Sequence, residues 1–293
     1  MPLTHTRQFR IRHYECDAYG HLNNVNYLRY MQETAFDASA AAGYGQSKYA
    51  AMGRYWLIRA NDIEYLSPLR YNDVVEIKTW VVDFRRVTSR RAYEFRREGS
   101  DQLVARGFSD WAFLDTGSGG PAPIPGELKA AFFPEGDSAG FTSRPRFPDA
   151  PSPPPGVFKM RRRVEWRDLD PENHVNNAVY LTYLEDCGFQ VAADYGWDVE
   201  RMRAAGFAIL ARRHRIQYRQ PAVMGDELEI ATWVSEMKRA SAVRHYTITR
   251  VADQTLIAKS HSLYAWVDVH NGRPVRILPE FLDDFRSNIA ASD

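Results

Sequence analysis

The sequence contains one long segment twice, and this duplication constrains the fold more than any other feature. Matching residues lie a constant 153 positions apart, as from Asp17 to Asp170. The same separation links residues along most of the two copies: His21 with His174, Arg59 with Arg212, Asp73 with Asp226, Thr79 with Thr232, Tyr93 with Tyr246 and Asp115 with Asp268. Solenoid proteins repeat every ~20–50 residues, so this longer period indicates a duplicated domain.

A segment of different composition joins the two copies. Pro, Gly and Ser are frequent from Pro134 to Gly156, which is typical of an extended linker. The chain has 293 residues, enough for two domains that each bury a core. We predict an N-terminal domain at residues 1–135, a linker at 136–156 and a C-terminal domain at 157–293.

Each copy follows the same order of expected elements. In the first copy, a short strand in which Phe9, Ile11 and His13 alternate with arginines precedes a polar loop. A helix is then predicted from about Asn24 to Ala42. Apolar and aromatic runs with turn residues between them predict the strands that follow, at residues 57–66, 74–84, 91–97 and 103–114. Short amphipathic tails at 127–133 and 280–285 end the copies, and the fold class is therefore α+β.

The long helix has apolar or aromatic residues around most of its circumference. Val25, Leu28 and Met31 lie on one side, while Tyr27 and Tyr30 cover much of the remainder. Such a helix has little surface suited to water. We therefore expect each antiparallel sheet to wrap around one buried helix.

Composition excludes several classes of protein and partner. A formal net charge of +1 gives no global field for binding nucleic acid. Two cysteines, Cys16 and Cys187, make neither a disulfide framework nor a metal-ligand pattern. No apolar run reaches membrane-spanning length and the N-terminus lacks a signal peptide. We expect a cytoplasmic protein that uses no metal and binds no membrane.

The loop before each predicted helix carries the same polar motif. It reads Asp17-Ala-Tyr-Gly-His21-Leu-Asn23-Asn24 in the first copy and Asp170-Pro-Glu-Asn-His174-Val-Asn176-Asn177 in the second. This motif resembles that of the hot-dog thioesterase superfamily. The first copy resembles the 4-hydroxybenzoyl-CoA thioesterase branch. The second, with Asp168-Leu169-Asp170 before the histidine, is similar to acyl-acyl-carrier-protein thioesterases. The resemblance implies two tandem hot-dog domains that hydrolyse an acyl-CoA or acyl-carrier-protein thioester without a cofactor.

The resemblance also implies roles for residues of both copies. Asp17 and Asp170 would act as nucleophile or as general base for water. The other expected catalytic residues are His21, His174, Asn24 and Asn177. Expected substrate-binding residues are Asn23, Asn176, Tyr27, Tyr180, Arg59 and Arg212.

This chemistry suits a carboxylate beside the start of a helix. A thioester carbonyl needs a base or nucleophile on one side and hydrogen-bond donors for the developing oxyanion on the other. Free N–H groups of the first helical turn, from Asn24 to Tyr27, would supply such donors. Asn residues before a helix are also common N-caps. Taken without the resemblance, the four Asn residues of the two motifs are therefore expected to be structural.

Some alternatives stay open at the level of the sequence. The second copy has Glu172 where acyl-carrier-protein thioesterases usually place an Asn, and Glu172 is either an additional general base or a solvent-facing side chain. A double hot-dog enoyl-CoA hydratase or dehydratase is a rival function, although Gly225-Asp226 is followed by Glu227 rather than by the motif of those enzymes. A noncatalytic acyl-binding module is another, because fold does not fix function. A homodimer of the tandem chain is compatible with exposed sheet edges.

Overall fold

The structure is a computed structural model that describes residues 1–136 and 143–291. The chain separates into two compact units, Met1–Arg146 and Phe147–Asp293. Six residues of the expected linker, 137–142, lie outside the described residues. Residues 143–154 of that linker have no regular secondary structure. The exact domain limits proposed from the sequence stay a prediction.

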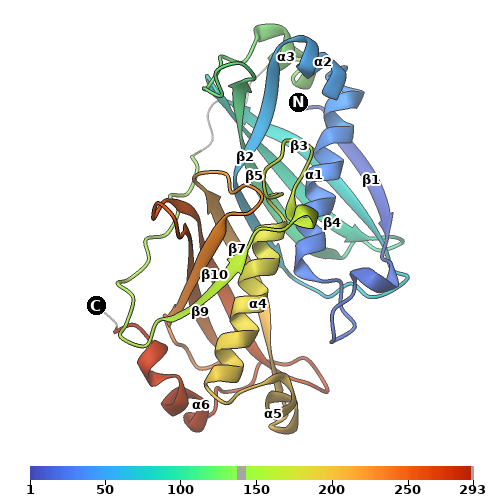
Figure 1. The fold of residues 1–293 in the computed structure, drawn as a ribbon. Coiled ribbons are helices and arrows are strands. Elements are labelled where there is room, and N and C mark those ends of the chain that lie inside the picture. The colour runs from blue at the N-terminus through green and yellow to red at the C-terminus, as the bar shows by residue number, and fades with distance from the viewer. Residues whose placement is uncertain (137–142, 292–293) are drawn as a thin grey trace. The chain divides into compact units, whose positions relative to one another are not determined.

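The first unit is an antiparallel five-stranded sheet with one long helix against it (Figure 1). The strand order is β1-β3-β4-β5-β2, and every neighbouring pair is antiparallel. The elements are β1 (Thr4–Arg10), η1 (His13–Glu15), α1 (Asn24–Ala41), α2 (Gln46–Ala51), β2 (Arg54–Tyr65), β3 (Val74–Phe84), β4 (Thr88–Arg97), β5 (Leu103–Asp115) and α3 (Gly126–Phe132).

The second unit repeats this plan in the order β6-β8-β9-β10-β7, again with antiparallel neighbours. Its elements are β6 (Phe158–Arg163), η2 (Trp166–Asp168), α4 (Val179–Asp194), α5 (Val199–Ala204), β7 (Phe207–Tyr218), β8 (Glu227–Ser235), β9 (Ser241–Arg250), β10 (Leu256–Asp268), α6 (Pro279–Asp284) and η3 (Arg286–Asn288). The predicted α+β fold with one central helix in each copy is confirmed.

The prediction for the first strand is wrong at its C-terminal end, because the strand is shorter than expected. Strand β1 stops at Arg10, and His13 begins the 3-10 turn η1. The turn forms because the backbone N–H of Arg12 donates to Glu15 Oε2 at 2.9 Å, while the N–H of Glu15 donates to the Arg12 carbonyl at 3.1 Å. These local bonds replace the ladder bonds of a strand.

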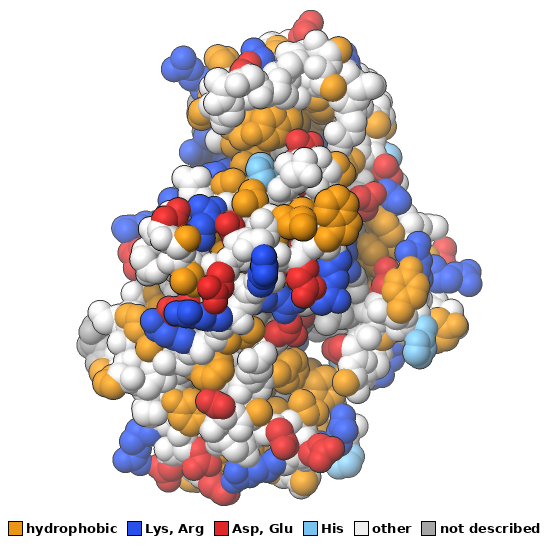
Figure 2. Space-filling model, viewed as in Figure 1, with side chains coloured by type: hydrophobic (Ala, Val, Ile, Leu, Met, Phe, Trp, Pro, Cys, Tyr) orange, Lys and Arg blue, Asp and Glu red, His pale blue; other side chains and the backbone are white. Residues whose placement is uncertain are grey.

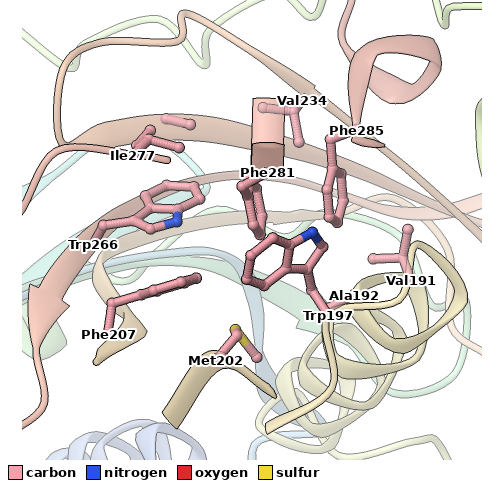
Figure 3. Close-up of a cluster of buried hydrophobic side chains, with 11 residues drawn as sticks. Val191, Ala192, Trp197, Met202, Phe207, Val234, Trp266, Ile277, Phe281 and Phe285 are labelled. Carbon is pink, nitrogen blue, oxygen red and sulfur yellow. The ribbon is translucent and has the colours of Figure 1, made fainter. Parts of the chain in front are cut away.

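Each unit contains a buried hydrophobic cluster in which aromatic side chains are prominent. In the second unit, Trp197 packs at centroid distances of 5.6 Å from Phe207 and 5.3 Å from Phe281 (Figure 3). Its indole N–H donates to Asp284 at 2.9 Å, so the one polar atom of the ring is satisfied. The core of the first unit includes Tyr49 and Phe113, which lie 6.2 Å apart.

Candidate active site

The loop before α1 holds the carboxylate of Asp17 in a closed turn. The Asp17 N–H donates to the carbonyl of His21 at 2.8 Å. Asp17 Oδ1 in turn accepts the N–H groups of Tyr19 at 2.8 Å and His21 at 3.0 Å. Gly20 closes the turn with a φ of 73°, a conformation that favours glycine. One carboxylate oxygen of Asp17 therefore orders the loop.

The second unit builds the same turn around Asp170. The Asp170 N–H donates to the His174 carbonyl at 2.9 Å, and Asp170 Oδ1 accepts the Glu172 N–H at 3.0 Å. Asn173 replaces the glycine with a φ of 60°, which Asn tolerates better than most residues. Burial raises the pKa of Asp170, against the opposing effect of the N–H donors of Glu172 and His174. A carboxylate with a raised pKa is a stronger base.

The histidine of the first loop stays neutral near pH 7. Burial of His21 lowers its pKa, and the nearby Arg70 lowers it further, although Asp17 acts in the opposite direction. A neutral imidazole can accept a proton or polarise a substrate group without adding charge to the site.

The N–H groups at the start of α1 are not all free, which corrects one expectation. Asn23 caps the helix, because its Oδ1 accepts the N–H of Val25 at 3.0 Å and its carbonyl accepts that of Asn26 at 3.0 Å. In the second unit, Asn176 Oδ1 accepts the N–H of Ala178 at 3.0 Å. Helix capping is thus an observed role of Asn23, whereas Asn176 holds the turn that precedes α4. A substrate contact by either residue stays a prediction.

The second helix begins later than the repeat predicts. Helix α1 starts at Asn24, whereas α4 starts at Val179, two positions beyond Asn177, the counterpart of Asn24. The N–H of Val179 donates to the Asn176 carbonyl at 2.9 Å, which leaves Asn177 in a turn before the helix. The Tyr218 hydroxyl then donates to the Asn177 carbonyl at 2.8 Å and holds that turn in place.

Two polar atoms in the second loop are buried and find no hydrogen-bonding partner within the described residues. These atoms are His174 Nδ1 and Asn177 Nδ2. Buried polar groups are almost always hydrogen-bonded, so an unsatisfied group needs an explanation. Both atoms belong to the motif that begins with Asp170.

Tyr27 and Tyr180 support the loops from inside each unit. They are 2% and 3% exposed. The Tyr180 hydroxyl accepts the N–H of Ala222 at 3.2 Å, and the Tyr27 hydroxyl has the equivalent contact with the backbone of Leu69. Burial raises the pKa of both phenols, so they are neutral at physiological pH. A contact between either tyrosine and the substrate stays a prediction.

Arg59 and Arg212 occupy matching bulges in β2 and β7. In the pairing of β2 with β5, the register shifts between Ile58 and Ala60, which places Arg59 at a bulge of β2. The pairing of β7 with β10 skips Arg212 in the same way. Bulges redirect a side chain and are frequent near active sites. This shared distortion supports a role for the two arginines, although substrate binding by them is untested.

A buried acid that the sequence analysis did not select precedes each loop. Glu15 is 8% exposed, and its Oε2 accepts the hydroxyl of Tyr30 at 2.7 Å. The Glu15 carbonyl accepts the N–H of Asn23 at 2.9 Å, so this residue connects η1 to the start of α1. Asp168 occupies the matching position, is 4% exposed and accepts the Glu165 N–H at 2.8 Å. Because both copies have an acidic residue at this position, the repeat in the sequence could have indicated it.

Exposure and burial bear on the two alternatives for Glu172 and on the reactivity of the two cysteines. Glu172 is exposed, which favours the solvent-facing alternative. Cys187 is fully buried, and burial raises its pKa to about 12. Burial also raises the pKa of Cys16. Neither thiol is suited to act as a nucleophile, because the thiolate is the reactive form.

The described residues hold neither a metal-ligand cluster nor a membrane-spanning helix. Among residues 1–136 and 143–291, no three His, Cys, Asp or Glu side chains gather so that they could bind a metal ion. No helix in that part of the chain is long and apolar enough to cross a membrane.

Comparison with known families identifies the class of protein that this fold and motif define. The sequence matches the thioesterase-like superfamily twice, over residues 11–132 and 164–285. The chain belongs to this superfamily, with one family domain in each structural unit. The resemblance read from the two loop motifs, and the expectation of a tandem hot-dog enzyme of the thioester hydrolase class, are confirmed at the level of the family.

Individual relatives are similar to one or both copies. The Escherichia coli K12 long-chain acyl-CoA thioesterase FadM is 28% identical over 110 residues, which cover 36% of this chain and 80% of that protein. The chloroplastic acyl-[acyl-carrier-protein] hydrolase FATB2 of Cuphea viscosissima is 22% identical over 191 residues, covering 62% of this chain and 46% of that protein. A crystal structure from Lactobacillus plantarum, assigned as an oleoyl thioesterase, superposes with a TM-score of 0.75 at 18% identity and covers 90% of this chain and 96% of its own. This last likeness shows the shared fold.

Proposed function

We propose that the protein hydrolyses an acyl thioester of coenzyme A or of acyl carrier protein to a free acid and a thiol, with Asp170 at the centre of the reaction. The observation that carries this proposal is the pair of unsatisfied buried atoms, His174 Nδ1 and Asn177 Nδ2, in the loop that Asp170 begins. Relatives named as acyl-CoA thioesterase and as acyl-[acyl-carrier-protein] hydrolase support the two substrate classes.

The chemistry follows from the groups at the loop. The carboxylate of Asp170 removes a proton from a water molecule that attacks the thioester carbonyl, or attacks that carbonyl itself. In the second route, loss of the thiolate leaves a mixed anhydride on Asp170, and water then cleaves this anhydride to release the acid and restore the carboxylate. The carbonyl oxygen becomes an oxyanion, and the amide of Asn177 can donate Nδ2–H to it. His174 Nδ1 can orient the attacking water or protonate the leaving thiolate. The C–S bond breaks, and water supplies the hydroxyl of the acid and the proton of the thiol.

The raised pKa of Asp170 suits the general-base route. Desolvation disfavours the charged carboxylate and so strengthens it as a proton acceptor. The hydrogen bond from the Glu172 N–H to Oδ1 holds the group in place, and the other carboxylate oxygen would take part in the reaction. The first loop has the same plan around Asp17, so we propose that it is a second catalytic centre.

The decisive experiment measures thiol release from a panel of acyl-CoA and acyl-carrier-protein thioesters. Wild type is compared with Asp170→Asn, Asp17→Asn and the double variant. Asn keeps the Oδ1 acceptor that orders each turn, so the loops remain folded. We expect Asp170→Asn to lower kcat by about 10²–10⁴-fold, the usual contribution of a general base.

Three outcomes would count against the proposal, each in a different way. Full activity in the double variant would remove both carboxylates from the mechanism. Binding of acyl thioesters without turnover by wild type would identify a noncatalytic acyl-binding module instead. Hydration of an enoyl-CoA by wild type would support the rival hydratase. A homodimer of the tandem chain stays a separate prediction.

A further inference from the structure

The second unit has a basic hollow beside, but outside, the loop of Asp170. The hollow has a volume of about 380 Å³ and is lined by Arg161, Arg162, Arg163, Gly225 and Glu227. The three arginines are consecutive residues at the end of β6. Gly225 and Glu227 come from the turn before β8 and from its first residue. A volume of this size lies within the usual range of small-molecule sites, about 300–1,000 Å³.

The hollow and the Asp170 loop share one supporting turn. The Gly225 N–H donates to the Val164 carbonyl at 3.1 Å, which joins the turn to the end of β6. The carbonyl of Ala222, three residues earlier in the same turn, accepts the Val175 N–H at 2.9 Å. Because Val175 directly follows His174, an anion in the hollow would lie next to the loop that carries the proposed chemistry.

The guanidinium groups of the hollow differ in how firmly they are already bound. Arg162 pairs with Asp186 at 2.7 Å and lies 4.4 Å from the ring centre of Tyr183. Arg161 has only a long contact of 3.7 Å with Glu227, and both side chains are more than half exposed. Arg163 makes no ion pair within the described residues. Arg161 and Arg163 therefore remain able to bind an anion.

The first unit has no equivalent basic run. The matching positions are Gln8, Phe9 and Arg10, with Asn72 in place of Gly225. The two copies have thus diverged at this point while keeping the loop motif. On the face shown in Figure 2, basic and acidic side chains are interspersed. The three consecutive arginines at the hollow differ from this pattern, because they place several positive charges close together.

Large apolar side chains are exposed on the segments that border the hollow. Trp166 follows Arg163 by three residues and is 75% exposed, and Met224, directly before Gly225, is 60% exposed. Exposed aromatic rings offer a stacking surface for a nucleobase. Arginines beside such a ring suit a ligand that carries both phosphates and a base.

We propose that this hollow binds the 3′-phosphorylated ADP portion of a coenzyme A thioester. Arg161 and Arg163 contact the phosphates, and Trp166 packs against the adenine. The inference rests on the proposed thioester hydrolysis and selects coenzyme A as the thiol carrier. A carrier protein needs about 800 Å² of contact surface on each partner, which a single small hollow does not provide, whereas a nucleotide phosphate fits it.

The test measures binding of coenzyme A itself by isothermal titration calorimetry, so it does not depend on turnover. The Arg161→Ala/Arg163→Ala double variant should raise the Kd for coenzyme A about 10–100-fold, because charge-assisted contacts are lost. Wild type should bind dephospho-coenzyme A, which lacks the 3′-phosphate, more weakly than coenzyme A. Glu227→Gln removes the acidic residue of the hollow and should lower the Kd about twofold to fivefold.

The matched control is Arg10→Ala. Arg10 is exposed and occupies the position of Arg163 in the first unit, so its loss should leave the Kd unchanged. In hydrolysis assays the double variant should raise KM for acyl-CoA and leave kcat nearly unchanged, as expected when a group contacts a distant part of the substrate.

Specific results would overturn the inference. One is a Kd for the double variant within twofold of wild type, with circular dichroism showing a folded protein. Another is slower hydrolysis of acyl-carrier-protein substrates alone, which would assign the arginines to a carrier protein. If the double variant loses coenzyme A binding while wild type hydrolyses no thioester, this inference stands and the proposed function fails.

Discussion

The buried hydrogen bond between Tyr30 and Glu15 offers a sharp test of how the first loop is held. The Tyr30 hydroxyl donates to Glu15 Oε2 at 2.7 Å, and the two residues are 6% and 8% exposed. Tyr30→Phe removes this donor and keeps the ring, which stacks on Phe9 at a centroid distance of 4.2 Å. The substitution therefore isolates one hydrogen bond to a buried carboxylate.

The size of the effect follows from the charge of the acceptor. Hydrogen bonds to charged groups contribute about 1.5–3 kcal/mol, and an acceptor left unsatisfied in the interior keeps its desolvation cost. The Arg12 N–H still donates to the same Glu15 oxygen at 2.9 Å, so the loss should not exceed that range. For a unit of this size, Tm should fall by roughly 3–12 °C.

Tyr14→Phe is the matched control. The Tyr14 hydroxyl accepts from Arg12 Nη1 at 2.9 Å, a similar length, but Tyr14 is 76% exposed. Water replaces that bond, so the free energy of unfolding should change by less than about 0.5 kcal/mol. Urea titrations followed by circular dichroism measure both variants. Equal effects of Tyr30→Phe and Tyr14→Phe would refute the argument that burial makes the Glu15 contact important.

Four further predictions concern residues of both units. Burial raises the pKa of Asp170, so the rate of hydrolysis should begin to fall on acidification at a pH above the usual Asp pKa of ~3.9. A pH–rate profile measures this, and Asp170→Asn should flatten the acid side of that profile. The charged carboxylate costs stability above its raised pKa, so the same variant should unfold at a higher urea concentration at pH 7. Gly107→Ala should lower the free energy of unfolding by about 1–3 kcal/mol. The added Cβ would lie 3.0 Å from the Asp62 carbonyl oxygen and 3.2 Å from Met31 Cε. An unchanged midpoint of urea unfolding would contradict this close approach. Cys187, with its pKa raised to about 12 and no exposed surface, should react with a thiol reagent only after unfolding, as mass spectrometry can show; labelling of the native protein would contradict its burial.

The long elements were predictable from the sequence, whereas the short ones were not. Helix α1 spans Asn24–Ala41, one residue shorter than expected, and β5 spans Leu103–Asp115 against an expected 103–114. The six-residue helices α2 and α5 were not predicted. A helix of this length has fewer than two turns, too few for an apolar period to appear, and tertiary packing provides most of its stability.

The repeat predicted equivalent sites, and the structure shows where they differ. The shared separation of 153 positions placed Asp17 and Asp170 in corresponding loops, and both do form the same closed turn. Yet the helix starts at Asn24 in one unit, while the counterpart Asn177 lies in a turn before α4. A pattern of residue types does not reveal this shift, because it depends on which N–H groups Asn23 and Asn176 bind.

The sequence by itself determined the duplication, the order of long elements and the loop motif, because these depend on residues close together along the chain and on apolar periodicity. Only the tertiary structure decided which polar atoms are satisfied. Tyr218 comes from a distant strand to hold the Asn177 carbonyl, and the Asn177 amide is left without a partner among the described residues. Burial and hydrogen bonding are set by residues that meet only on folding, so the chemical state of Asp170 and its neighbours was settled there.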